Sequence, residues 1–364
     1  KKERLLCRRG KNSRGGIYFV TFFNGAKSAA DKIIKGKIWS HCINFSANFC
    51  TYKLKFSRSC VIMHNEIIHF RNPRKNGNAR VCAAKKTAGT MAKLMGIDVG
   101  STTVKVTVVE QDGTVLYKSY ERHFAQVRET VLRELNKIKE QFGGEFSASI
   151  TGSAGLGLSQ RSGINFVQEV QAAFVAIRRF YPDADAAIEL GGEDAKIIFI
   201  TGGTEQRMNG SCAGGTGAFI DQMATLLNIS VQEMDEYALR AEKIYPIASR
   251  CGVFAKSDIQ PLLNQGARKE DISASIFQAV VDQTVSGLAQ GRRIKGKVLF
   301  LGGPLYFLKG LRRAFVRTLK LSEENAVFPE DAPCFMSIGA ALHSAGVKPM
   351  SIDDIISAIE HAEG

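Results

Sequence analysis

Long apolar runs are missing from this chain of 364 residues. No stretch approaches the roughly 20 consecutive apolar residues that a membrane-spanning helix needs, so we expect no membrane partner. Residues 17–23 follow basic residues, as in a signal peptide, but this run is short for an apolar h-region and the recognisable fold begins far downstream. The sequence also lacks a Gly-x-x-x-x-Gly-Lys-[Ser/Thr] loop, which argues against a P-loop ATPase.

Cysteine is scarce in the part of the chain that looks folded. Five of the 8 cysteines fall within the first 90 residues, and the remainder of the chain keeps only Cys212, Cys251 and Cys334. An odd, sparse set in a segment of this size argues against the disulfide framework of a secreted protein. We therefore predict a reducing compartment, the cytoplasm.

Basic charge is confined to one end of the sequence. The whole chain has a formal net charge of +14, but residues 1–90 hold 20 Lys and Arg against 3 Asp and Glu, which leaves −3 for residues 91–364. The basic excess therefore gives no reason to expect a nucleic-acid partner for the larger part.

Residues 1–90 show no sustained helical or strand period. Two interpretations stay open: a basic appendage that binds an acidic partner, or upstream sequence read through before a start at Met91 or Met95. The lack of agreement between pattern, turns and propensity favours the second. We predict a leader over residues 1–90 that is disordered or non-native.

The pattern of residues 91–184 predicts a first α/β lobe. Strands are expected at 94–99, 104–109 and 115–120, with a turn at Gln111-Asp112-Gly113. Apolar residues at three- and four-residue spacing predict a helix over 124–142, closed by Gly143-Gly144, and a short strand follows at 147–151.

A second lobe is predicted over residues 185–345, followed by a C-terminal tail over 346–364. Strands are expected at 187–190, 196–200 and 298–301, and helices at 213–227 and 272–290. Two strand-glycine-turn-strand openings, about ninety residues apart, suggest duplicated lobes.

The first opening, residues 96–105, reads GIDVGSTTVK. An acidic residue at a strand end, then glycine and hydroxyl residues in a turn, then a lysine, offer a place for Mg²⁺-bound phosphates. The alternative is an ordinary tight hairpin with a solvated aspartate.

The second opening, residues 189–196, reads ELGGEDAK and again combines an acidic residue at a strand end, a glycine turn and a lysine. Two such hairpins facing each other could clamp a triphosphate between lobes. Gly302 and Gly303 follow a later strand, where they would let the backbone approach a base or ribose closely. Each motif alone is also compatible with a plain turn, but three in this order indicate a nucleotide site.

These motifs resemble those of the actin, sugar kinase and heat-shock chaperone ATPases. The matching segments are residues 98–103 for the first phosphate motif, the segment from Glu189 for the second, 301–303 for the adenosine motif and 337–341 for the closing connection. The resemblance implies an actin-like fold of two ribonuclease-H-like lobes with a nucleotide cleft between them. Many members have Asp where this chain has Glu189, which puts the metal role of that position in doubt.

Two cysteine motifs narrow the resemblance. Residues 209–217 read NGSCAGGTG and residues 249–258 read SRCGVFAKSD, and both are similar to motifs of the activators of acyl-CoA dehydratases and benzoyl-CoA reductases. A thiolate at a helix start is stabilised by the partial positive charge there, a cluster needs four thiolates, and two-fold symmetry would double the two present. The alternative is a pair of small buried cysteines.

The family resemblance implies an ATP-dependent one-electron donor. It implies a homodimer that shares one [4Fe-4S] cluster, reduced ferredoxin or flavodoxin as the electron source, and a 2-hydroxyacyl-CoA dehydratase-type or benzoyl-CoA reductase-type partner. We expect ATP and Mg²⁺ as cofactors, catalytic roles for Asp98 and Glu193, and cluster ligands at Cys212 and Cys251. Nucleotide contacts are expected at Gly100, Ser101, Thr102, Thr103, Lys105, Gly191, Gly192, Gly215, Thr216, Gly302, Gly303 and Gly339.

Other interpretations make different demands on the sequence. A sugar or pantothenate kinase of the same fold would need a carboxylate base facing a substrate hydroxyl and no cluster. A chaperone-like module would need a peptide-binding domain. We interpret Cys334 as structural, and His123, His343 and His361 as surface or satisfied histidines. Residues 260–266, QPLLNQG, look closer to long fused family members, and we take this as a sign that the chain is a fragment.

Overall fold

The computed structural model describes residues 92–209, 214–248 and 252–362, together with the backbone of five short strands before residue 70. The chain divides into two compact units, Lys1–Gly89 and Thr90–Gly364. In the first unit, β1 (Leu6–Lys11) pairs antiparallel with β2 (Ile17–Phe22), and β3 (Phe56–Ser57), β4 (Cys60–Met63) and β5 (Glu66–His69) form a small antiparallel sheet. The sequence pattern missed these strands; the disordered or non-native character of the leader stays a prediction.

The first sheet of the second unit combines a meander with two parallel strands. Strands β6 (Lys93–Val99), β7 (Thr103–Val109) and β8 (Val115–Arg122) are antiparallel neighbours, and β9 (Glu145–Thr151) and β10 (Asn165–Phe166) add parallel to β6, in the order β10-β9-β6-β7-β8. One face is covered by α2 (Val127–Gln141), α3 (Gly155–Ser162) and α12 (Ile352–Glu360), whose apolar residues share a core with the strands.

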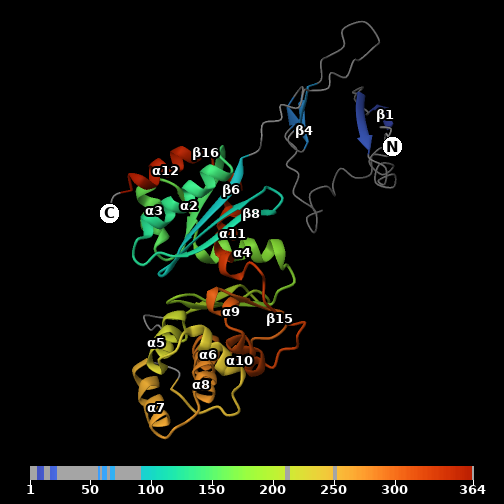
Figure 1. Ribbon diagram of the computed structural model, residues 1–364. Helices are drawn as coiled ribbons and strands as arrows, with labels where there is room; N and C mark the ends of the chain where they lie inside the picture. The colour runs from blue at the N-terminus through green and yellow to red at the C-terminus, as the bar shows by residue number, and fades with distance from the viewer. Residues whose placement is uncertain are drawn as a thin grey trace. The chain divides into compact units, whose positions relative to one another are not determined.

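The second sheet repeats the five-strand order of the first sheet, which also has a short sixth strand, β16 (Met350–Ser351), paired antiparallel with β9. Its strands are β11 (Ala186–Leu190), β12 (Ala195–Phe199), β13 (Glu205–Met208), β14 (Val298–Leu301) and β15 (Ala326–Val327), in the order β13-β12-β11-β14-β15. Again three antiparallel strands come first, and two parallel strands join the first of them. The equal strand order in both sheets confirms the prediction of two ribonuclease-H-like lobes (Figure 1).

Helices cover one face of the second sheet, and together they form the largest hydrophobic core of the described residues. This layer contains α5 (Gly217–Leu227), α6 (Val231–Leu239), α7 (Gly252–Asn264), α8 (Lys269–Asp282), α9 (Gly303–Phe307) and α10 (Lys309–Leu319). The helix predicted over 272–290 is α8 continued by a π-helical segment, η1 (Gln283–Leu288). The helix predicted from residue 213 begins at Gly217 instead, because Gly215 has a φ of 82°, which helical backbone does not allow.

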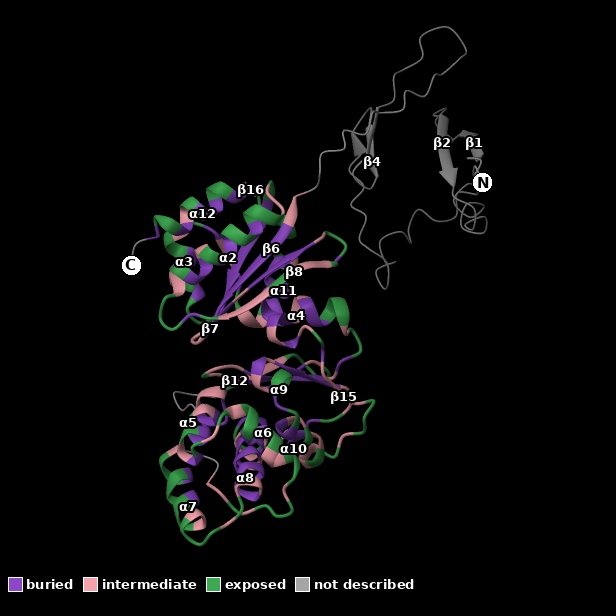
Figure 2. Cartoon of the chain, in the orientation of Figure 1, coloured by how far each residue is buried: buried purple, intermediate pink, exposed green. Residues whose placement is uncertain are grey.

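A layer of two helices lies between the sheets. The helices α4 (Glu169–Phe180) and α11 (Phe335–His343) contact each other, and both sheets place buried residues against them (Figures 1 and 2). In β14 the side chains alternate, with Val298 and Phe300 in the outer core and Leu299 and Leu301 in the core that includes α4. Strands covered on both faces read as continuous apolar runs, which is why the sequence indicated them clearly.

The end of the chain packs on the first lobe. Helix α11 contacts β6, and α12 contributes Ile352, Ile355 and Ile359 to the core that the first sheet forms with α2 and α3. Residues 335–345 were predicted as part of the second lobe and 346–364 as a tail. Because α11 also shares a buried core with β14 of the second sheet, these bounds stay predictions. The sequence could not show this return, because an apolar helix face does not reveal which sheet it covers.

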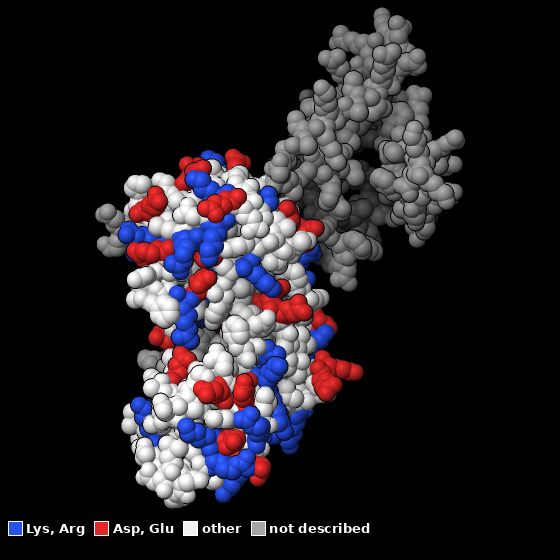
Figure 3. Space-filling model, in the orientation of Figure 1, with Lys and Arg blue, Asp and Glu red and all other residues white. Residues whose placement is uncertain are grey.

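Charged side chains of both signs are interspersed on the visible face of both lobes (Figure 3). This agrees with the small net charge of residues 91–364. Across the segments that the structure describes, none of the helices combines the length and the apolar character needed to cross a bilayer.

Gly339 allows α11 to cross α4 closely, so Gly339→Ala should destabilise the protein. An added Cβ would lie 1.9 Å from the carbonyl oxygen of Ala172, and backbone cannot yield as a flexible side chain does. We expect the free energy of unfolding, measured by urea denaturation, to fall by about 1–3 kcal/mol, as overpacking usually costs. Gly346→Ala is the control, because nothing lies within 4 Å of its added Cβ. Equal stability of the two variants would contradict the close crossing.

Candidate functional site

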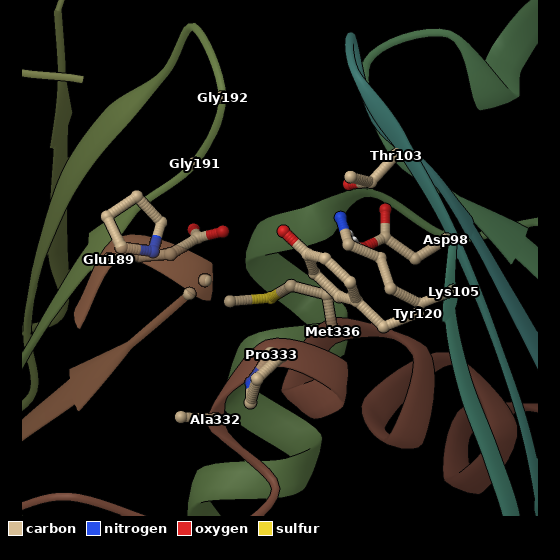
Figure 4. Close-up of a pocket in the computed structure, with 13 residues that line it drawn as sticks. Asp98, Thr103, Lys105, Tyr120, Glu189, Gly191, Gly192, Ala332, Pro333 and Met336 are labelled. Atoms are coloured by element: carbon tan, nitrogen blue, oxygen red, sulfur yellow. Dashed lines mark ion pairs between the residues drawn. The ribbon is translucent and has the colours of Figure 1, made fainter. Parts of the chain in front are cut away.

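A small cavity opens where strand ends of the two lobes face each other (Figure 4). Its volume of about 30 Å³ leaves room for only about one or two water molecules. The first lobe contributes side chains from β6, β7 and β8, the second lobe contributes β11 and glycine-rich turns, and the start of α11 closes the floor. The lining residues are Asp98, Thr103, Lys105, Tyr120, Glu189, Gly191, Gly192, Gly302, Gly303, Pro304, Ala332, Pro333 and Met336.

An ion pair forms the wall contributed by the first lobe. Asp98 and Lys105 are direct cross-strand partners on β6 and β7, and Lys105 Nζ lies 3.0 Å from Asp98 Oδ2. Burial lowers the pKa of Lys105, but the charge of Asp98 and its hydrogen bond outweigh that effect and hold the pKa above its ordinary value. Lys105 is therefore a permanent cation in the cavity, able to face a phosphate.

The turn between β6 and β7 is tightly fixed. The N–H of Gly100 donates to the carbonyl oxygen of Thr103 at 3.0 Å. Gly152, directly after β9, has a φ of 99°, and a Cβ there would lie 2.6 Å from Asp98 Oδ1. Gly152 thus makes room for the buried carboxylate, a role that the sequence motifs did not assign, although a glycine directly after a strand was a visible signal.

The second glycine hairpin is bonded to helix α5. The N–H groups of Gly217 and Ala218 donate to the carbonyl oxygens of Gly191 and Gly192 at 3.0 and 2.8 Å. Across the cavity, a Cβ on Gly192 would lie 2.3 Å from Thr102 Oγ1. The tips of the two hairpins are therefore in contact.

A buried lysine gathers carboxylates on the side of the second lobe. Lys196 is paired with Glu169 at the start of α4, and its Nζ lies 3.4 Å from Glu189 Oε2 and 3.8 Å from Asp194 Oδ2. Burial lowers the pKa of Lys196, but Glu189 and Glu169 raise it well above its ordinary value. Burial also raises the pKa of Glu169, against the opposing effect of Lys196.

Glu189 is the side chain on this wall that best suits a metal ion. Its Oε2 is buried and makes no hydrogen bond, despite the nearby Lys196. Within the described segments, no group of three or more His, Cys, Asp or Glu could hold a metal alone. Mg²⁺ usually takes one or two carboxylates and completes its shell with water and substrate phosphates, and Asp98 and Glu189 fit that pattern from opposite walls.

The third glycine motif lets the backbone approach the cavity. Gly302 has a φ of 89°, and a Cβ there would lie 2.0 Å from the carbonyl oxygen of Leu190 on the neighbouring strand. A Cβ on Gly303 would lie 2.5 Å from Tyr120 Oη, which belongs to the first lobe. Tyr120 thus fills the space beside Gly303, and sequence reasoning did not identify it.

The structure brings some of the predicted residues together and leaves others apart. Asp98, Thr103, Lys105, Gly191, Gly192, Gly302 and Gly303 line the cavity, and Gly100, Ser101 and Thr102 form the adjoining turn. Glu193 is exposed at the tip of its hairpin, Gly215 and Thr216 are buried beside η1 and at the start of α5, and Gly339 faces α4. The functional roles of all these residues stay predictions.

Cys212 and Cys251 lie outside the described residues. The helices that follow them in the sequence, α5 and α7, meet near their first turns: a Cβ on Gly252 would lie 3.1 Å from Gln222 Oε1 and 3.9 Å from Phe219. Val253 and Phe254, in the first turn of α7, are 68% and 64% exposed. The two cysteine motifs thus lead into neighbouring helices of one lobe.

Two lobes of equal topology around a cleft with three glycine turns define an ATPase of the actin and sugar kinase fold. The chain belongs to the BadF/BadG/BcrA/BcrD ATPase family, whose model matches residues 95–344. This finding confirms the family resemblance that the motifs suggested.

Relatives with assigned names agree with this placement. The (R)-2-hydroxyglutaryl-CoA dehydratase activating ATPase of Acidaminococcus fermentans is 31% identical over 219 residues, 57% of this chain and 82% of that protein. The activator of lactoyl-CoA dehydratase of Anaerotignum propionicum is 30% identical over 255 residues, 69% of this chain and 96% of that protein. The crystal structure of component A of the A. fermentans dehydratase superposes with a TM-score of 0.61 and 28% identity, covering 70% of this chain and 98% of that one.

Cys334 should be a poor nucleophile in the folded protein. Its side chain is buried, its Sγ donates to the carbonyl oxygen of Ser119 at 3.5 Å, and burial raises its pKa to about 11. Since the thiolate is the reactive form, we expect alkylation at pH 8 to be at least ~100-fold slower than in urea, where the pKa returns to about 8.5. Peptide mass spectrometry would separate Cys334 from the other cysteines. Equal rates in the two states would show that the thiol is accessible.

Proposed function

We propose that this protein is an ATP-hydrolysing activator that passes one electron to a 2-hydroxyacyl-CoA dehydratase-type or benzoyl-CoA reductase-type enzyme. Membership of the ATPase family and the names of the relatives support the activator role. The observation that carries the ATPase part is the pair of buried carboxylates, Asp98 and Glu189, that face one cavity from opposite lobes beside Lys105. A reducing compartment, the cytoplasm, is part of the proposal.

Each wall of the cleft has a distinct task toward Mg²⁺ and ATP. The turn at Gly100, Ser101 and Thr102 presents backbone N–H groups and hydroxyls to phosphate oxygens, and Lys105 supplies positive charge. Gly302 and Gly303 would contact the nucleoside once Tyr120, which fills the space beside Gly303, moves aside. Asp98 and Glu189 would hold Mg²⁺, either directly or through water.

Hydrolysis needs positioning and charge more than covalent chemistry. Water attacks the terminal phosphate, and the transition state is stabilised by the cations and N–H groups around it. Asp98 would orient the attacking water or the metal bound to it. Glu193 could take part only after a rearrangement of its hairpin, because it is exposed and outside the residues that line the cavity.

The hydrogen bonds between α5 and the second glycine hairpin could transmit motion at the nucleotide site to the region of Cys212. When the lobes separate or close, Gly191 and Gly192 move with their hairpin, and α5 follows because its first N–H groups donate to them. Arg122 of the first lobe also pairs with Asp221 on α5 at 3.2 Å. Motion of either lobe therefore reaches the helix that follows Cys212.

We propose Cys212 and Cys251 as ligands of a [4Fe-4S] cluster shared by two copies of the chain. Two cysteines per chain require a two-fold partner to reach four thiolates. The exposed Val253 and Phe254 beside Cys251 support burial of this region in a homodimer. The cluster would supply a one-electron carrier, refilled by reduced ferredoxin or flavodoxin, in an anaerobic setting.

Asp98→Asn should lower Mg²⁺-dependent ATP hydrolysis by at least ~100-fold, the usual cost of losing a preorganised charge at the reacting centre. Phosphate release at saturating Mg²⁺ and ATP measures this. Asp353→Asn is the control, because Asp353 pairs with Lys139 on the surface. Since removal of Asp98 also leaves Lys105 unpaired, Glu189→Gln serves as a second variant, and circular dichroism checks folding. Full activity in both folded variants would overturn the assignment of the cleft.

Anaerobically purified protein should be brown, with about four iron and four sulfide per two chains. Cys212→Ala and Cys251→Ala should each lose iron and colour, whereas Cys334→Ala should keep both. Iron and sulfide analysis with visible absorption measures this. A colourless wild-type protein that phosphorylates a sugar or pantothenate would contradict the proposal.

A further inference from the structure

His123 is a buried histidine beside the first glycine turn, and neither the motifs nor the relatives assign it a role. It follows the last residue of β8, and only 7% of its surface is exposed. Its Nε2 lies 3.1 Å from the carbonyl oxygen of Gly100, and its backbone N–H donates to the carbonyl oxygen of Thr102 at 3.2 Å. Residue 123 therefore holds the turn at two points.

The hydrogen-bond network defines which nitrogen of His123 carries the proton. The N–H of Ala125 donates to Nδ1 at 3.1 Å, so Nδ1 is the acceptor. A neutral imidazole then has its proton on Nε2, which donates to Gly100. Both ring nitrogens are used by backbone groups, and the ring orientation is fixed from both sides.

Unusual backbone conformations accompany this arrangement. Phe124 and Ala125 have φ values of 45° and 65°, two consecutive non-glycine residues in the left-handed region. Packing does not hold Phe124 there, because its side chain is 80% exposed. Such strain persists only where surrounding bonds over-determine it, and here the bent chain brings the N–H of Ala125 onto His123.

We propose that His123 is a positioning residue that holds the first glycine turn in the conformation that accepts nucleotide phosphates. Across a trans peptide the C=O of one residue and the N–H of the next point in opposite directions. The carbonyls of Gly100 and Thr102 point toward residue 123. The N–H groups of the next residues, Ser101 and Thr103, therefore point away from the His123 ring, on the side where a phosphate could bind. This inference rests on the proposed function, in which that turn binds ATP.

Two substitutions of His123 each keep one of the two ring hydrogen bonds and remove the other. In His123→Gln the amide nitrogen reaches the place of Nε2 and can still donate to Gly100. In His123→Asn the amide oxygen takes the place of Nδ1 and can accept from Ala125, but the bond to Gly100 is lost. The backbone bond from residue 123 to Thr102 is available in both variants, which favours folding of both.

The steady-state kinetics of ATP hydrolysis by the full-length protein test the role. We expect His123→Asn to raise the KM for ATP about five- to tenfold with kcat within about twofold, since one hydrogen bond that supports binding is lost. His123→Gln should keep KM within about twofold of wild type. His361→Gln is the control, because His361 is exposed directly after helix α12, away from the first glycine turn, and should change neither constant. Equal KM changes in the Asn and Gln variants, or none in either, would overturn the proposal.

Amide hydrogen exchange without nucleotide separates this inference from the proposed function. Residues 100–103 should exchange faster in His123→Asn than in wild type, and at the wild-type rate in His123→Gln. If the wild-type protein hydrolyses no ATP but only His123→Asn exchanges faster, the proposed function is refuted, whereas the role of His123 in holding the first glycine turn is supported. Equal exchange in all three proteins, together with normal ATP hydrolysis by the wild type, would refute the positioning role of His123 and leave the proposed function intact.

Discussion

The close crossing of α4 and α11 between the two sheets is the constraint on which the site depends. A Cβ on Gly339 would lie 1.9 Å from the carbonyl oxygen of Ala172, and one on Gly96 would lie 1.8 Å from that of Ser337. Helix α11 can therefore approach both α4 and β6 at backbone distance. This thin middle layer brings the ends of β6 and β11 close enough for Asp98 and Glu189 to line one cavity.

The charged side chains in and beside the cavity do not balance. Four carboxylates, Asp98, Glu169, Glu189 and Asp194, surround the two lysines Lys105 and Lys196, so negative charge is in excess. A divalent cation would offset that excess, and the buried Oε2 of Glu189, which makes no hydrogen bond, could coordinate it. Entry of Mg²⁺ and phosphates would thus replace the direct contact of the two hairpins by contacts through the ligand.

The sequence predicted the parts of the site that local motifs encode. Asp98, Lys105, Gly302 and Gly303 were found because strand ends followed by glycine have a local pattern, and the structure places all four at the cavity. Tyr120 and Gly152 were missed as site residues because their relevance comes from distant contacts: Tyr120 meets Gly303, and Gly152 makes room for Asp98. Lys196 stood at the end of the second motif, but the motif did not reveal its pairing with Glu169. Gly339 had a motif, yet its surroundings give it a packing role between helices.

His123 shows how a residue without a motif can determine the shape of a motif. Read from the sequence it is one histidine among six, with no ligand spacing. Only the folded chain brings it from the end of β8 to the turn between β6 and β7, where its ring and backbone hold two carbonyls of that turn. Next to it, Arg122 pairs with Asp221 of α5. Two adjacent residues at the end of β8, Arg122 and His123, therefore contact both helix α5, which follows Cys212 in the sequence, and the first glycine turn, so a change in either element acts on the same short segment.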